Sequence, residues 1–178
     1  MVKRSLTALE PLQRTNYVYG SSPIYAWITI VFTWLASLLP WREWEGAPDI
    51  LILVLAFWCV QQVRGVGLTS ALIFGLMMDV HDATVMGGHA LSYVLVIFGA
   101  LVFRRRMAQF GFISQMLQML PVFFLAPFAS HLLNAWLQGA WGGWTWLLSG
   151  LITGVMWIVA DLILKLPLRP VDDNETLN

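Results

Sequence analysis

The chain is poor in charge: 11% of its 178 residues are Asp, Glu, Lys or Arg, against roughly 25% in a typical soluble domain. Basic and acidic residues balance at ten each, which gives no electrostatic case for binding nucleic acid. A single cysteine, Cys59, excludes an internal disulfide framework and any Cys-x-x-Cys metal or redox motif. What the chain has instead is apolar surface. Because 58% of its residues are hydrophobic, it has the composition of an integral membrane protein.

Apolar runs recur along the chain, and a helical run of about 20 residues spans the hydrocarbon core of a bilayer, about 30 Å thick. They predict an all-α integral membrane protein with six transmembrane helices. The predicted spans are residues 24–39, 50–63, 68–78, 88–103, 116–137 and 144–166. The third span is short for a full crossing. Either a polar loop dips into the membrane to meet this span, or the span is partly re-entrant and its backbone is covered by protein.

Basic residues test this count, because cytoplasmic loops of membrane proteins are enriched in Lys and Arg. Six spans with both termini in the cytoplasm place nine of the ten basic residues on the cytoplasmic side and only Arg42 outside. We therefore expect a cytoplasmic segment at 1–22, a six-helix transmembrane domain at 23–168 and a short acidic cytoplasmic tail at 169–178. No signal-peptide cleavage pattern follows the first apolar run, so we interpret that run as a retained helix.

Small residues at helical spacing indicate where transmembrane helices approach one another. Gly67, Ala71 and Gly75 are spaced by four, and Asp79 continues the same stripe at the outer end of the third span. The fifth span carries a polar stripe that follows Pro127, and the sixth carries a Gly-x-x-x-Gly motif. The small and polar residues of these last two spans are His131, Asn134, Gly150, Gly154 and Asp161. We expect the third, fifth and sixth spans to meet around a polar seam.

Ionisable residues inside a membrane are costly and are functional hypotheses by default. Asp161 lies four residues before Lys165, a spacing that favours an ion pair near the cytoplasmic end of the helix over a proton relay. His131 and Asn134 lie deeper in the fifth span. They favour hydrogen bonds to a neighbouring helix, and ligand binding is the alternative.

The loop between the third and fourth spans gathers charge in an otherwise apolar region. Its ionisable residues are Asp79, His81, Asp82 and His89. Carboxylates and imidazoles can bind metals, but the spacing matches no zinc motif and supplies no third nearby histidine. We favour a loop in which Asp79 or Asp82 caps backbone N–H groups while Gly87 and Gly88 let the next helix begin. Contact with a partner or a ligand is compatible with such a cap.

Three stretches of the chain form a recognisable pattern: "PDILILVLAFW" at 48–58, "GLTSALIFGLMMDV" at 67–80 and "GGHALSYVLV" at 87–96. Together they resemble the MreD family of rod shape-determining proteins. The family pattern is an apolar helix opened by Pro and a polar residue, a Gly-x-x-x-Asp helix end, and a glycine before an Ala-Leu-x-Tyr-like run. Gly75 and Asp79 match the helix end, and Gly87 or Gly88 matches the loop glycine. Residues 81–86 depart from the Ser/Gly-rich loop that is usual in the family.

The resemblance implies a multi-pass protein of the bacterial cytoplasmic membrane, with a fold similar to the six-helix substrate-binding subunits of ECF vitamin transporters. It also implies a non-enzymatic role in cell elongation and peptidoglycan biosynthesis, without metal or cofactor. The implied partners are the bitopic protein MreC, the cytoskeletal MreB and the RodA/PBP2 pair. We predict a scaffold whose small-residue stripes and outer loop between the third and fourth spans hold the transmembrane helix of an MreC-like partner.

No order of Ser, His, Asp or Cys predicts a nucleophile, and no glycine-rich loop follows a strand, so we expect no enzyme. The alternative function is a small-molecule-binding membrane subunit of the ECF type. Its pocket would lie near the outer loop and would be lined by Asp79, His81, His89 and Asn134. We also expect an outer interfacial belt of aromatic residues that sets the depth of the protein in the membrane. That belt comprises Trp41, Trp44, Trp141, Trp144 and Trp146.

Overall fold

The structure is a computed structural model that describes residues 23–44, 46–83, 85–107, 112–139, 141 and 143–165. Every regular element in this part of the chain is helical. The elements are α1 (Pro23–Ser37), the 3₁₀ helix η1 (Pro40–Glu43), α2 (Ile50–Val60), α3 (Leu68–His81), α4 (Gly88–Met107), α5 (Phe112–Gln138) and α6 (Thr145–Lys165). The expected cytoplasmic segment at 1–22 and the acidic tail at 169–178 lie outside the described residues.

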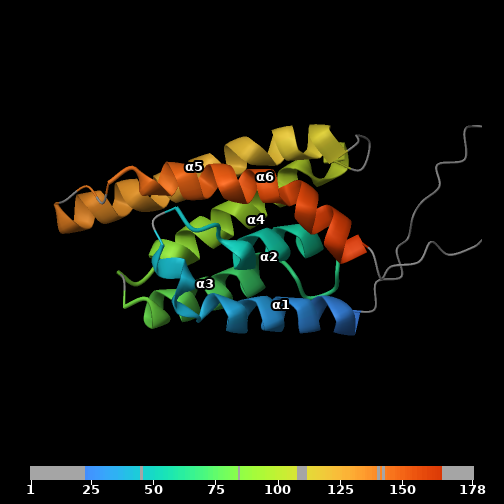
Figure 1. Cartoon of the computed structure of the whole chain (residues 1–178), viewed down its shortest axis with the longest axis horizontal. Helices are drawn as coiled ribbons and strands as arrows, with labels where there is room; N and C mark the ends of the chain where they lie inside the picture. The colour runs from blue at the N-terminus through green and yellow to red at the C-terminus, as the bar shows by residue number, and fades with distance from the viewer. Residues whose placement is uncertain are drawn as a thin grey trace, which may run out of the picture.

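The α-helices run alternately in opposite directions along the long axis of the molecule (Figure 1). The connections α1–α2, α3–α4 and α5–α6 gather at one end, which we call the outer end, following the topology expected from the basic residues. α1 begins and α6 ends at the opposite, inner end (Figure 1). An up-and-down arrangement of antiparallel helices is the expected result of short connections between successive helices.

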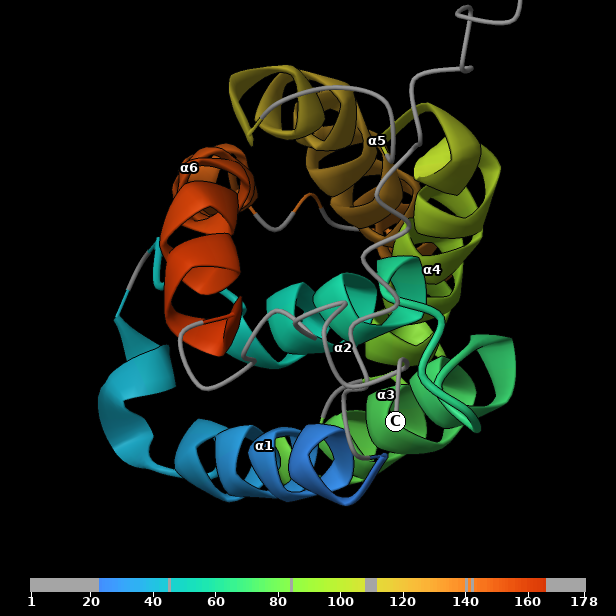
Figure 2. The same cartoon turned by 90° about the vertical axis from the view of Figure 1, so that its right-hand side faces the viewer.

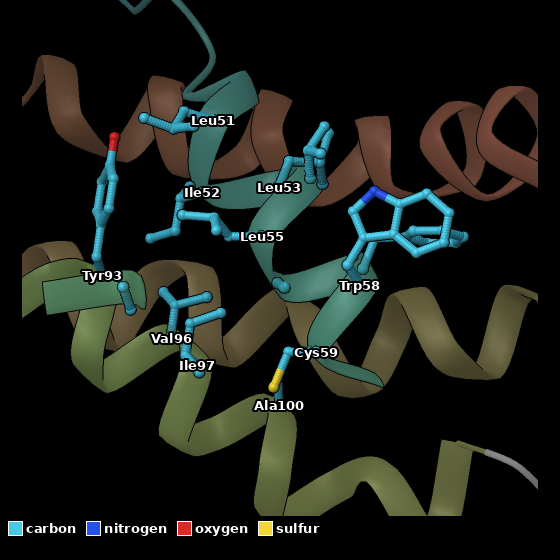
Figure 3. Packing of buried hydrophobic residues seen from close by; sticks show 14 of the residues in the cluster. Leu51, Ile52, Leu53, Leu55, Trp58, Cys59, Tyr93, Val96, Ile97 and Ala100 are labelled. Carbon is cyan, nitrogen blue, oxygen red and sulfur yellow. The ribbon is translucent and has the colours of Figure 1, made fainter. Parts of the chain in front are cut away.

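The shortest α-helix, α2, lies in the middle of the bundle between α1, α4 and α6 (Figure 2). Its eleven residues make a helix about 16 Å long. Residues 51–59 are all buried, which explains why this segment has no polar face. Side chains of α2 and α4 meet in the core, where Leu55 and Cys59 lie near Val96, Ile97 and Ala100 (Figure 3).

Trp58 is one of the two largest fully buried side chains of this core, together with Trp157 (Figure 3). Its indole N–H donates to the hydroxyl of Thr29 in α1 at 2.8 Å, so the one polar atom of the ring is satisfied. The ring also makes edge-on contacts with Phe57, at a centroid distance of 5.0 Å, and with Tyr25, at 5.6 Å. Trp58 therefore joins the central helix to α1 by packing and by a hydrogen bond.

The order of packing corrects one expectation. α4 stands between α3 and α5 (Figure 2), and α6 packs on α5 and α2. The third, fifth and sixth spans therefore do not share one seam, because the small residues of each face the helix next to it. Gly75 of α3 meets Ala90 of α4, and Gly150 of α6 meets the backbone of Phe123 in α5.

The observed helices differ from the predicted spans mainly at their ends. α2 ends at Val60, three residues early, and the chain reverses at Gln62, which has a φ of 61°. α3 continues three residues beyond its predicted end, to His81. By length and composition, two described segments suffice for a full membrane crossing, Ser114–Gln138 and Thr145–Leu164, and the other four helices are shorter and apolar.

Candidate functional site

Asp79 caps the start of α4. One carboxylate oxygen accepts the backbone N–H of His89 at 2.7 Å, and the other accepts those of Gly87 at 2.9 Å and Ala90 at 3.2 Å. The residue is 1% exposed. The first N–H groups of a helix have no partner within the helix, and the N-terminus carries partial positive charge. The buried carboxylate of Asp79 therefore accepts the free N–H groups of α4 and balances the partial positive charge of its N-terminus. This is the cap that the sequence favoured.

The four ionisable residues at the junction of α3 and α4 form a chain that begins at this cap. The ring Nδ1 of His89 lies 3.1 Å from Asp79 Oδ1, and its Nε2 lies 3.5 Å from Asp82 Oδ2. Asp82 Oδ1 in turn lies 2.7 Å from Nδ1 of His81, whose side chain is 43% exposed. The chain thus leads from a buried carboxylate to an exposed imidazole. Among the described residues, no group of three or more His, Cys, Asp or Glu could hold a metal ion.

The start of α4 is held closely on two sides. A Cβ on Gly75 would lie 2.5 Å from Cα of Ala90, so only glycine lets α3 approach this closely. A Cβ on Gly88 would lie 3.1 Å from Asn134 Nδ2 of α5. Ser130, also of α5, donates its hydroxyl to the Gly88 carbonyl at 2.6 Å. Polar groups of α3 and α5 therefore meet at the first turn of α4.

A cavity of about 450 Å³ lies beside this turn, at the outer end of the bundle. We call it the outer cavity. Its walls come from the starts of α2, α4 and α6, from the outer half of α5 and from the loop before α2. Its lining side chains include Asp49, Phe123, Ser130, His131, Asn134 and Trp146. Of the pocket residues expected from the sequence, His89 and Asn134 line the outer cavity and Asp79 and His81 do not.

Asp49 ties three helices together at the floor of the outer cavity. Its carboxylate accepts the N–H of Ile52 at 3.3 Å, capping α2, and the hydroxyl of Tyr93 in α4 at 2.8 Å. Its backbone N–H donates to the hydroxyl of Thr153 in α6 at 3.0 Å. The stretch "APD" at residues 47–49 is typical of a helix start, so the sequence alone predicts that a helix begins at Asp49. Nothing in the sequence pairs it with Tyr93 or Thr153, because those contacts depend on tertiary packing.

His131, Asn134 and Trp146 form one wall of the outer cavity. The ring of His131 lies 5.6 Å from that of Trp146, and its Nδ1 bonds to the Pro127 carbonyl at 3.0 Å. The Asn134 side-chain oxygen and the Trp146 indole N–H are buried and have no hydrogen-bond partner among the described residues. Trp146 is only 8% exposed. Its expected place in an interfacial belt is therefore wrong, because its ring packs inside the bundle.

The other tryptophans of the expected belt lie at the surface to different degrees. Trp44 and Trp144 are 80% and 67% exposed, which suits an interfacial position. Trp41 is partly buried, and its indole N–H donates to the Ala36 carbonyl at 2.6 Å.

The remaining small and polar residues pack within the chain. Ala71 is fully buried on α3, whereas Gly67 precedes that helix in open space. A Cβ on Gly150 would lie 2.9 Å from the Phe123 carbonyl oxygen, the one that Pro127 leaves without its usual helical donor.

Two further residues lie on α6. Gly154 packs against Leu120 of α5, since a Cβ there would lie 3.6 Å from the nearest Leu120 atom. Asp161 is 2% exposed. The side chain of Lys165 lies outside the described residues, so the Asp161–Lys165 ion pair stays a prediction.

Comparison with known proteins gives one informative result. A family model described as "rod shape-determining protein MreD" matches residues 13–166. No curated protein and no solved structure matches the chain, so the likeness to ECF substrate-binding subunits stays a prediction. The family match covers most of the chain, including the Asp79 cap and the outer cavity. The chain therefore belongs to the MreD family of rod shape-determining proteins.

Proposed function

We propose that this protein is a non-enzymatic scaffold subunit of the bacterial cell-elongation complex that binds an MreC-like bitopic partner through α3 and the outer loop. Family membership implies a membrane protein with a role in rod shape determination. The proposal adds six spans in the cytoplasmic membrane, both termini in the cytoplasm, and association with MreB and the RodA/PBP2 pair in peptidoglycan synthesis.

The exposed face of α3 is the observation that carries this proposal. One face of this helix is buried against α4, and the opposite face is apolar and open. The open residues are Leu72, Ile73, Leu76, Met77 and Val80, which are 37% to 66% exposed. They recur at spacings of three and four, so they form one stripe along the helix. A stripe of this kind fits the side of a second transmembrane helix.

The length of α3 favours a protein neighbour over lipid alone. Its 14 residues make a helix about 21 Å long, shorter than the hydrocarbon core. A helix too short for its bilayer is accommodated by thinning the bilayer or by associating with other helices. The stripe also leads directly into the outer loop, where Met86 is 71% exposed beside the polar pair His81 and Asp82. A partner that crosses the membrane along α3 would meet this loop as it emerges.

Site-specific photocrosslinking in living cells tests the proposal. A photoreactive phenylalanine analogue is placed at Ile73, Leu76 or Met86, one position at a time. Matched controls carry it at Leu125 of α5 and Leu162 of α6, which are each 66% exposed but lie on other helices. We expect the α3 and loop positions to crosslink to a single-span membrane protein and the controls to react with lipid. Equal protein crosslinking at all positions, or none at the α3 and loop positions, would contradict the proposal.

A further inference from the structure

We propose that the outer cavity binds a small organic cation that presents several N–H donors. The cavity volume of about 450 Å³ falls in the range of small-molecule sites, roughly 300–1,000 Å³. Its wall is more polar than that of an average small-molecule site, since nine of the nineteen lining residues carry polar side chains and the rest are apolar or aromatic residues or glycine. This assignment concerns a different surface from the α3 face, so it does not depend on the proposed partner.

Three hydroxyl groups of the cavity wall, those of Ser130, Ser149 and Thr153, have already used their protons. Ser130 donates to the Gly88 carbonyl at 2.6 Å, and Ser149 donates to the Ala47 carbonyl at 2.6 Å. Thr153 donates to the carbonyl of Ser149 at 2.8 Å. A hydroxyl has one proton and two lone pairs, so each of these three groups can meet a ligand only as an acceptor.

Two more wall groups are acceptors. A carbonyl oxygen can only accept, so the bond between His131 Nδ1 and the Pro127 carbonyl places a proton on Nδ1. In the neutral ring, Nε2 is then an acceptor. The side-chain oxygen of Asn134 is buried with no partner in the described part of the chain. A buried acceptor without a donor is unfavourable, and a donor on a ligand would remove that cost.

The charge of the wall selects among donor-rich ligands. Asp49 supplies a carboxylate to the cavity wall, and none of the described lining residues is Lys or Arg. Of the three helix N-termini in the wall, those of α2 and α4 would favour an anion, but each is already capped, by Asp49 and by Asp79. Aromatic rings of Trp146 and Phe123 complete the wall, and such rings attract cations. The buried indole N–H of Trp146 would suit an acceptor elsewhere on the same ligand.

Three probes of equal size and different charge test this assignment. Benzamidine is a planar cation with four N–H donors, benzamide is its neutral analogue, and benzoate is the anion. Binding of each to the purified full-length protein is measured by isothermal titration calorimetry. We expect saturable one-to-one binding of benzamidine, roughly tenfold tighter than benzamide, because charge-assisted hydrogen bonds are about twice as strong as neutral ones. We expect no binding of benzoate.

Variants separate the cavity from the rest of the surface. Asp49→Asn keeps a good helix-capping residue and removes the charge, so it should abolish the preference for benzamidine over benzamide. Asn134→Leu should weaken the binding of benzamidine. Trp144→Phe, at an exposed site outside the cavity wall, should leave that binding unchanged. Thermal unfolding shows that each variant is folded. Tighter binding of benzoate, binding of no probe, or equal effects of Asn134→Leu and Trp144→Phe would overturn the assignment.

Discussion

Asp79 and His89 are joined twice across the outer loop. The backbone N–H of His89 donates to Asp79 Oδ1 at 2.7 Å, and the ring Nδ1 lies 3.1 Å from the same oxygen. Asp79 lies at the end of α3 and His89 in the first turn of α4. The pair therefore fixes the two helices relative to each other at the loop that the proposed function offers to a partner. The Asp79 cap therefore has a structural role, because it positions the loop between α3 and α4.

Replacing Asp79 by Ala should destabilise the protein. Three backbone N–H groups would lose their acceptor at a buried site, with an expected cost of about 2–4 kcal/mol in the free energy of unfolding. The measurement is unfolding of the purified protein in detergent. Asp82→Ala is the matched control, because the Asp82 side chain is 26% exposed and contacts the side chains of His81 and His89. Equal losses for the two variants would show that the cap does not hold the α3–α4 junction.

Substitution by Ala should have different effects at the two glycines of the α3 stripe, Gly67 and Gly75. In Gly75→Ala the new Cβ would lie 2.5 Å from backbone Cα of Ala90, so α3 and α4 must move apart. Overpacking of this kind costs about 1–3 kcal/mol. Gly67→Ala has open space within 4 Å and should cost less than about 1 kcal/mol. Thermal midpoints of the two variants check the difference, and a tolerated Gly75→Ala would disprove the close approach.

The Trp58–Thr29 hydrogen bond should contribute about 1 kcal/mol to stability. A double-mutant cycle of Trp58→Phe and Thr29→Val isolates this bond from the loss of ring packing. The two single variants should each lose stability, and the double variant should lose less than their sum. Strict additivity would mean that the bond adds nothing beyond the packing of the ring.

The helices could be predicted from the sequence because each apolar run is bounded by polar or glycine-rich residues. The prediction that Asp79 or Asp82 caps α4 succeeds for the same local reason, since donor and acceptor lie within eleven residues. Asp49 and Tyr93, which form a hydrogen bond, lie 44 residues apart in the chain. Their contact could therefore not be predicted from local sequence. Periodicity also cannot distinguish a small residue that faces a partner from one that faces its own bundle, as Gly150 does.

The alternative pocket predicted from the sequence places His89 and Asn134 correctly, but the rest of the outer cavity's wall could not be predicted, for a related reason. The cavity exists because the short central helix α2 begins beside the first turns of α4 and α6, and the relative depth of helices is set by packing. Trp146 shows the same limit. A tryptophan at the start of an apolar run matches the pattern of an interfacial anchor, yet its ring turns inward against His131.

Native mass spectrometry of the protein, extracted gently from its own membrane, tests the central claim of a partner-binding scaffold most directly. We expect a complex in which the 178-residue chain travels with a single-span membrane protein. Leu76→Arg, on the exposed face of α3, should release that partner, and Leu125→Arg, on α5, should not. A chain that travels without any protein partner, or a complex that survives Leu76→Arg unchanged, would contradict the account.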